Sequence, residues 1–204
     1  MKALFSIVVL MLLIAGQPSM AAAEGCHPRP FTGAGVLPYA KVGGRTLLLL
    51  GYETGRGWLS FGGKPKLVRS LDDDEPRCET HLETAAREGF EEMRRMVDYR
   101  KILTAIDARR YFPRSAGARD FRTYSIAIDY VPAAEFRQIA TPSGTDYDEI
   151  DNYFWIDLET LTNIVTAGER VLPNAPNGGR LWKKSLFDLQ QALGDTAFRR
   201  KLFP

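Results

Sequence analysis

The sequence predicts a single α+β domain built around a mixed β-sheet. Its 204 residues are 45% hydrophobic and 25% charged, which suits one globular domain with a sizeable core. Segments with strand patterning occur both before and after segments with helical periodicity, and this mixed order predicts a mixed sheet. The chain shows no internal repeat, low-complexity tract or convincing linker. We therefore expect one domain that spans about residues 30–204.

The first 23 residues have the pattern of a secretory signal. Lys2 precedes an apolar run of about 14 residues, and Ala21-Ala22-Ala23 fits a small-residue cleavage site. An uncleaved anchor is the alternative, but a bilayer span needs about 20 apolar residues. We expect residues 1–23 to be removed and the mature chain, residues 24–204, to form the domain with its C-terminal helices. The protein would then be exported, periplasmic or secreted, with no stable membrane anchor.

Charge and cysteine content narrow the possible partners. The net charge is +2, and loss of Lys2 with the signal would lower it by one, so neither nucleic acid nor an anionic membrane is expected as the main partner. Export would place Cys26 and Cys78 in an oxidising compartment, which favours a disulfide. Two unpaired thiols are the alternative, because sequence does not show whether the two Cα atoms come within bridging distance.

The N-terminal half of the domain is expected to begin with strands. Residues 31–40, "FTGAGVLPYA", and 45–53, "RTLLLLGYE", have strand composition and are joined by the turn "KVGG". Residues 58–63, "WLSFGG", predict a third short strand that ends in glycines. Residues 64–78 carry an acidic run and two prolines, so we expect a surface coil there.

Helical periodicity follows that coil. Residues from Glu79 to about Val97 predict a helix whose core-facing positions recur at spacings of three and four: Leu82, Ala86, Gly89, Phe90, Met93 and Val97. The rest of the chain predicts an alternating strand at 121–130, a short helix near Ala133–Ile139 and a strand at 152–158. The tail predicts a packing helix that ends at Gly194, with Trp182, Leu186, Leu189 and Leu193 on one face.

The predicted helix from Glu79 gathers three carboxylates on one surface. Glu88 lies one helical turn from both Glu91 and Glu92, and like charges so placed oppose each other by a few tenths of a kcal/mol per pair. Taken alone, the pattern favours a solvated face with pairs such as Arg87–Glu91 and Glu91–Arg95. The glycine pair in "SFGGK" upstream changes this interpretation, because paired glycines let the backbone approach a bound ion or phosphate closely.

With these residues in view, the chain resembles the Nudix hydrolase family. Glu79, seven residues and then "REGFEEMRR" reproduce the second half of the family's sequence box. The first half departs from it, because Gly63 stands sixteen residues before Glu79 instead of six, and the ten extra residues include "LDDDE". Gly89 replaces an aliphatic residue, and Arg94 and Arg95 replace a closing glycine and an aliphatic residue. This resemblance implies a mixed sheet sandwiched between helices.

The resemblance also implies an activity: hydrolysis of a diphosphate linkage in a nucleoside diphosphate joined to another group, with Mg²⁺ or Mn²⁺. A hard divalent ion held by oxygens neutralises the charge of a diphosphate. Carried over residue by residue, Glu88, Glu91 and Glu92 would be metal ligands, and the carbonyl of Gly63 would complete the metal shell. Arg87 would orient a glutamate.

The base and the substrate contacts stay open at this point. One of the three glutamates, or Glu149 in "YDEID", would activate the attacking water, and a solvated loop acid is the alternative for Glu149. The segment "RRYFPR", which contains Arg109, Arg110 and Arg114 with Tyr111 and Phe112, suits phosphate and base binding or, alternatively, a surface loop with a packed aromatic residue. Tyr52 and Trp58, which flank "TGRG", suit the same two roles, substrate contact or packing.

Two other functions compete with the enzyme: a non-catalytic Nudix-like nucleotide-binding module, and an interaction domain that uses the insert "VRSLDDDEP". The expected partner is a small nucleotide diphosphate, with ADP-ribose, NAD(H), dinucleoside polyphosphates and nucleotide sugars as unranked candidates. The sequence leaves the oligomeric state open.

Overall fold

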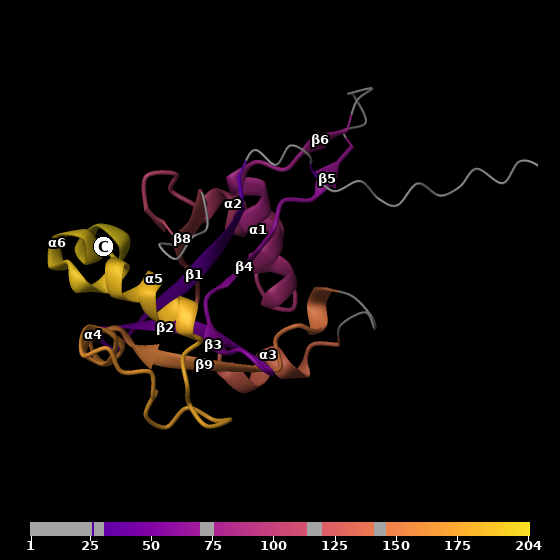
Figure 1. The fold of residues 1–204 in the computed structure, drawn as a ribbon. Helices are drawn as coiled ribbons and strands as arrows, with labels where there is room; N and C mark the ends of the chain where they lie inside the picture. The colour runs from indigo at the N-terminus through magenta and orange to yellow at the C-terminus, as the bar shows by residue number, and fades with distance from the viewer. Residues whose placement is uncertain (1–25, 27–30, 70–75, 114–119, 141–145) are drawn as a thin grey trace, which may run out of the picture.

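The computed structural model describes residue 26 and residues 31–69, 76–113, 120–140 and 146–204 (Figure 1). The signal at 1–23, the acidic run "LDDDE" and Arg114 lie outside the described residues. Within the described residues, no helix is both long and apolar enough to cross a membrane.

A seven-stranded sheet forms the centre of the domain. Its main order is β3-β2-β1-β8-β7, with β4 paired to β1 and β9 paired to β2. The strands are β1 (Gly33–Val42), β2 (Arg45–Glu53), β3 (Gly57–Leu59), β4 (Phe61–Gly63), β7 (Tyr111–Pro113), β8 (Phe121–Ala127) and β9 (Asn152–Asp157). β1 and β8 run parallel and the other pairs run antiparallel, so the sheet is mixed as the sequence predicted.

The β1–β2 hairpin turns at two glycines. Val42 pairs with Arg45, and Gly43 and Gly44 between them have φ values of 57° and 75°. A two-residue hairpin loop with two positive φ angles matches the twist of the flanking strands, and glycine adopts it without steric cost. The predicted turn is confirmed.

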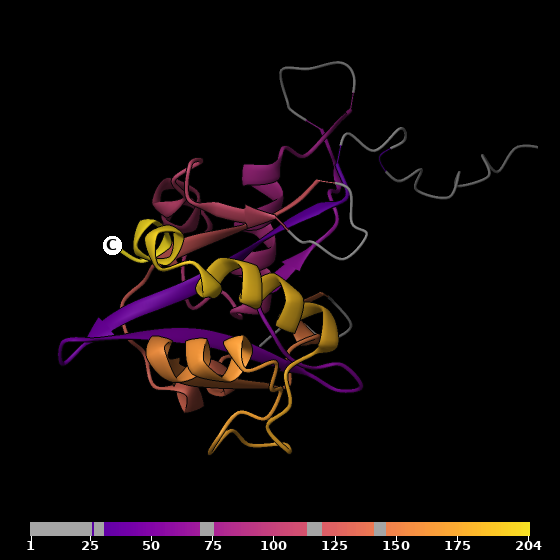
Figure 2. The same cartoon turned by 60° about the vertical axis from the view of Figure 1, so that its left-hand side comes forward.

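Helices cover both faces of the sheet (Figures 1 and 2). One face packs on α4 (Leu158–Thr166), α5 (Lys183–Gly194) and α6 (Thr196–Leu202), and the other packs on α1 (His81–Glu92), α2 (Tyr99–Ala105) and α3 (Ala133–Gln138). Alternation along β2 divides the core, since Leu48 and Leu50 face the first group and Leu49 faces the second. The expected α+β sandwich is confirmed.

Three predicted elements differ from the structure. "WLSFGG" is two strands, because Trp58 pairs with β2 whereas Phe61 pairs with β1. The helix predicted from Glu79 to Val97 is wrong at both ends, since α1 begins after the N-cap Thr80 and ends at Glu92. The predicted coil at 64–78 also contains a small hairpin of β5 (Leu67–Val68) and β6 (Arg77–Cys78).

Two arginines end α1 where a glycine is common. Arg94 and Arg95 have φ values of 53° and 63°, and the Arg95 amide donates to the Phe90 carbonyl at 2.8 Å. Arg94 Nη2 also donates to the Ile150 carbonyl at 3.2 Å, and the Arg95 guanidinium lies 4.5 Å from the centre of the Tyr147 ring. These contacts offset the cost of left-handed backbone at non-glycine residues and tie the loop at 147–150 to the end of α1.

A disulfide joins Cys26 to Cys78 across 52 residues, with Cα atoms 5.6 Å apart. The bridge favoured by the sequence is confirmed. It attaches the chain before β1 to β6, which directly precedes the acidic helix.

Candidate active site

The acidic helix starts at a fully capped end. The Thr80 hydroxyl accepts from the Glu83 amide at 3.3 Å, and the Glu83 carboxylate accepts from the Thr80 amide at 2.8 Å. Arg77 donates to the same carboxylate at 2.6 and 2.8 Å, and these hydrogen bonds lower the pKa of Glu83 to about 2. The start of α1 is thereby held against the β5–β6 hairpin.

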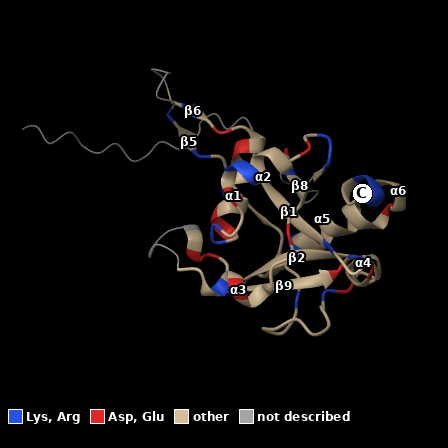
Figure 3. Cartoon of the chain, turned by 180° about the vertical axis from the view of Figure 1, so that it is seen from behind, with Lys and Arg blue, Asp and Glu red and all other residues tan. Residues whose placement is uncertain are grey.

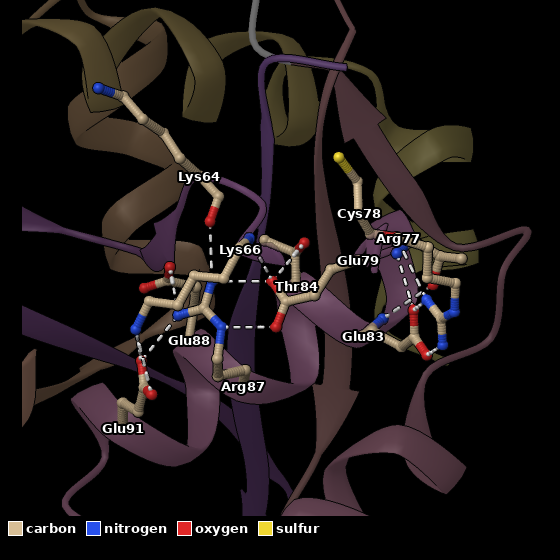
Figure 4. Close-up of polar contacts among 11 residues, drawn as sticks. Lys64, Lys66, Arg77, Cys78, Glu79, Glu83, Thr84, Arg87, Glu88 and Glu91 are labelled. Carbon is tan, nitrogen blue, oxygen red and sulfur yellow. Dashed lines mark hydrogen bonds and ion pairs between the residues drawn. The ribbon is translucent and has the colours of Figure 1, made fainter. Parts of the chain in front are cut away.

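Glu79 lies just before this cap and not inside the helix as predicted. Its side chain is buried and accepts from Arg87 Nε at 2.7 Å, Arg87 Nη2 at 3.0 Å, the Lys66 amide at 2.9 Å and the Thr84 hydroxyl at 3.1 Å (Figure 4). Arg87 Nη2 also donates to the Lys64 carbonyl at 2.8 Å. Glu79 therefore fixes one edge of the Arg87 guanidinium and the loop that follows β4.

The other edge of Arg87 faces the carboxylates of α1. Arg87 Nη1 donates to Glu91 at 2.7 Å and forms an ion pair with Glu88 at 2.8 Å. Burial alone would lower the pKa of Arg87. Its hydrogen bonds to Glu79 and the negative charges of Glu88, Glu79 and Glu91 raise this pKa instead. Arg87 thus stays protonated and contacts both Glu88 and Glu91.

Glu88 and Glu92 form a buried acidic pair. Glu92 is 2% exposed and accepts from the Gly62 amide at 2.5 Å, while the Tyr153 hydroxyl donates to its carbonyl at 2.6 Å. Burial raises the pKa of Glu92 well above 4.5, and the charge of Glu88 raises it further. Burial raises the pKa of Glu88 to about 7, although Arg87 opposes the shift. Two buried carboxyls near one another resist ionisation together.

Glycines on two elements allow this packing. A Cβ at Gly63 would collide with the Glu88 carboxylate, so the glycine leaves room for this carboxylate against β4 in its present position. A Cβ at Gly89 would lie 2.8 Å from Val36 Cγ2, so the glycine that replaces the aliphatic residue of the family box lets α1 approach β1. The glycine pair of "SFGGK" is thus brought onto the acidic residues.

The donor set suits a hard divalent ion in its chemistry, because Glu88, Glu92 and the Gly63 backbone offer oxygens and a cation would relieve the repulsion of the buried pair. No three acidic, histidine or cysteine side chains in the described part of the chain already converge around one point. Glu91 is turned to Arg87, and its other oxygen lies 3.5 Å from Lys66 Nζ.

Glu149 is exposed and follows a 3₁₀ turn, Asp146–Asp148. It lines the same cavity as Glu88, and its charge contributes to the raised pKa of Glu92. The neighbouring Asp151 accepts from the Thr54 amide at 2.9 Å and the Thr54 hydroxyl at 2.6 Å, which secures the far end of this loop. Tertiary structure therefore brings Glu149 to the acidic helix.

A cavity of about 460 Å³ opens beside the acidic pair. Gly63, Glu88 and Glu149 line it together with basic and aromatic side chains, among them Arg56, Lys64, Lys66, Lys184, Trp182 and Phe121. Along α1 itself Arg87 is the one arginine or lysine among four acidic residues, Glu83, Glu88, Glu91 and Glu92 (Figure 3). A cavity with carboxylates at one end and cations around it can hold a metal-bound phosphate chain.

The described part of the predicted substrate loop, up to Pro113, does not line this cavity. Arg109 Nε and Arg110 Nε lie 3.1 and 3.3 Å from the Asp107 carboxylate, and Phe112 is buried in the core. Within the described residues, the loop therefore matches the alternative of a surface loop with a packed aromatic residue. Trp58 is also fully buried, and Tyr52 packs against it.

The sequence did not predict that Trp182, Arg56 and Lys184 lie together at the cavity wall. Trp182 was assigned to a packing face, but it stands before α5 and lines the cavity with Arg56 and Lys184. The run "WKK", an aromatic residue next to two lysines at a helix start, was the available signal. Glu53 was also missed: burial raises its pKa, Arg56 opposes this at 2.7 Å, and Glu149 adds to the shift.

No family profile and no curated protein matches the chain. Solved structures similar to it include a Caenorhabditis elegans Ap4A hydrolase complex, 17% identical over 80% of this chain and 98% of that one, with a TM-score of 0.42. The NUDIX domain of Shewanella oneidensis NrtR with ADP ribose is 12% identical over 78% and 84%, with a TM-score of 0.43. A Francisella tularensis NMN adenylyltransferase/ADP ribose pyrophosphatase with AMP and manganese is 18% identical over 82% and 43%, with a TM-score of 0.41. Because these TM-scores are below 0.5, the function proposed below depends on this chain's own residues.

Proposed function

We propose that this chain is a metal-dependent hydrolase that cleaves the diphosphate linkage of a nucleoside diphosphate joined to another group. The observation that carries the proposal is the buried pair Glu88 and Glu92 beside a cavity rich in cations. A purely structural helix gains nothing from burying two carboxyls whose pKa values are both raised. A divalent metal ion would balance the charge of the two carboxylates, and a phosphate group would balance the charge of the cations in the cavity.

Glu88, Glu91, Glu92 and the Gly63 carbonyl are the proposed ligands of Mg²⁺ or Mn²⁺. A bound ion of this kind neutralises phosphate oxygens and acidifies water. Arg87 is a positioning residue, because it holds Glu91 and Glu88 while Glu79 holds it. One of the glutamates, or Glu149 at the cavity wall, would accept a proton from the attacking water.

The cations of the cavity would bind the remaining phosphate charge. Lys64 and Lys66 follow β4 directly, so they line the cavity next to Gly63 and Glu88. Their positive charge would hold the departing phosphoryl group and keep the substrate diphosphate near the acidic pair.

The test is turnover of a panel that contains ADP-ribose, NAD(H), a dinucleoside polyphosphate and a nucleotide sugar, with Mg²⁺ or Mn²⁺. Released phosphomonoesters are converted to phosphate by an added phosphatase and counted. We expect turnover by the wild type and by Glu135→Gln, whose exposed carboxylate lies on α3, and loss of most turnover in Glu92→Gln. Binding without turnover would instead favour the nucleotide-binding module.

We also propose that the protein is exported as a mature single domain, residues 24–204. The Cys26–Cys78 bridge supports this, because disulfides persist mainly in oxidising compartments. N-terminal sequencing of protein from the producing cell should begin at Glu24. A chain that retains Lys2 would contradict the proposal.

A further inference from the structure

Trp182 is fixed at the cavity wall by backbone pairing with β3. The Trp182 amide donates to the Trp58 carbonyl at 2.9 Å, and the Trp58 amide donates to the Arg180 carbonyl at 2.9 Å. Leu181 between them forms a bridge with Trp58 and is fully buried. The segment before α5 is thus attached to the sheet edge. The backbone at Trp182 is therefore held in place by its pairing with β3.

Two cations lie against the indole. The Arg56 guanidinium is 5.5 Å from the ring centre and Lys184 Nζ is 5.2 Å from it. Arg56 is held in turn by Glu53 at 2.7 Å. Trp182 is partly exposed and has these two cations over its ring, so a π-surface and anion contacts lie within a few ångströms of each other.

The same cavity connects this surface to the acidic pair. Arg56 directly precedes β3, Trp182 directly precedes α5, and Lys184 lies in α5. They line the same cavity of about 460 Å³ as Gly63 of β4 and Glu88 of α1. That volume falls within the range of small-molecule sites. A ligand with a diphosphate near Glu88 therefore reaches Trp182 with the group attached to that diphosphate.

We infer that Trp182 stacks the base of a nucleotide while Arg56 and Lys184 contact its phosphates. Every nucleobase has a π-face that can stack on the indole, whereas a phosphate group has none. The preferred substrates would be those whose diphosphate carries a nucleoside, with little selection among the nucleobases. The inference rests on the proposed function, which it deepens by assigning the residue that recognises the nucleoside part.

The experiment compares two probes that share a diphosphate, ADP and inorganic pyrophosphate. Their dissociation constants are measured by calorimetry with Mg²⁺ present, because the proposed site holds a diphosphate through the ion, and recovery of the intact probe afterwards shows that turnover did not interfere. Trp182→Ala should weaken ADP binding roughly 10-fold and pyrophosphate binding less than about twofold. Trp182→Phe should restore ADP binding to within about threefold, because a ring remains.

Two control variants separate stacking from charge and from folding. Phe187→Ala removes an exposed aromatic residue from the same helix and should leave both constants unchanged. Lys184→Ala should weaken both probes by a similar factor, since it removes only a charge.

Equal weakening of both probes by Trp182→Ala, no weakening of ADP binding, or a wild type that binds neither probe would each overturn the inference. Turnover is measured separately, so the hydrolase proposal and the role of Trp182 can be refuted independently. If no nucleotide of the panel is hydrolysed but ADP binding depends on Trp182, the enzymatic proposal fails and the base subsite stands. If nucleotides are hydrolysed and ADP binding ignores Trp182, the reverse holds.

Discussion

Replacing Glu88 by Gln should make the metal-free protein more stable at pH 8, although the change removes an ion pair with Arg87. Burial raises the pKa of Glu88 from 4.5 to about 7 in the folded protein, even with Arg87 opposing the shift. Each unit corresponds to about 1.4 kcal/mol, so the ionised form costs on the order of 3 kcal/mol of folding free energy. Gln keeps the size of the side chain and cannot ionise.

The sign of the pH dependence follows from the raised pKa. The unfolded chain loses the Glu88 proton near pH 4.5, whereas the folded chain keeps it until about pH 7. The stabilising contribution is therefore complete below about pH 4.5 and is lost as the pH rises through about 7. Wild type should lose on the order of 3 kcal/mol more than Glu88→Gln over this window.

Urea unfolding followed by circular dichroism at pH 4.5 and pH 8, with a chelator present, measures this difference. Groups that do not interact with Glu88 cancel when the two pH differences are compared, and Glu135→Gln controls for loss of an exposed charge. Glu92 adds to the difference in the same direction, because the Glu88 charge that raises its pKa is absent from Glu88→Gln. Added Mg²⁺ should reduce the loss in wild type only, because the ion favours the ionised carboxylate. Equal pH dependence in wild type and Glu88→Gln would refute the reasoning.

Three further changes have expected outcomes. Glu92→Gln should lose most turnover and most of the Mg²⁺-induced rise in melting temperature; retention of both would contradict its role as a ligand. Thiol titration of unreduced, denatured protein should find no free thiol, and reduction of Cys26–Cys78 should lower the unfolding free energy by roughly 4 kcal/mol for a loop of 52 residues, as measured in urea. Arg87→Lys should lower turnover at least about tenfold and stability by about 2–4 kcal/mol, because an ammonium cannot replace the forked contacts to Glu79 and Glu91; wild-type kinetics and stability would show that those contacts are unimportant.

Features set by neighbours in the chain were accessible from the sequence. The composition of residues 45–53 predicted a strand, and the structure shows Leu48 and Leu50 facing one core and Leu49 the other, since side chains alternate along any strand. Spacings of three and four placed Glu88, Glu91 and Glu92 on one surface, because helix geometry is the same in every context. Gly43 and Gly44 marked the hairpin for a similar local reason.

Local rules did not predict where α1 ends. Its periodic pattern continues beyond Glu92, but the chain turns at Arg94 and Arg95 in a left-handed conformation that neither residue favours by itself. Contacts with Ile150 and Tyr147, more than fifty residues away, help to hold this turn. The outcome depends on a tertiary contact and could not be obtained from propensity.

Only the tertiary structure decided what surrounds the three glutamates. Burial against β4 raises the pKa of Glu88, and no local pattern reports how much water a side chain will lose. Attachment of the 180–182 segment to β3 carries Trp182 to the cavity, although its position in the sequence predicted a packing role. Sequence periodicity determines which residues share a face of one element, whereas the packing of distant elements determines what that face meets, and the chemistry of this site depends on both.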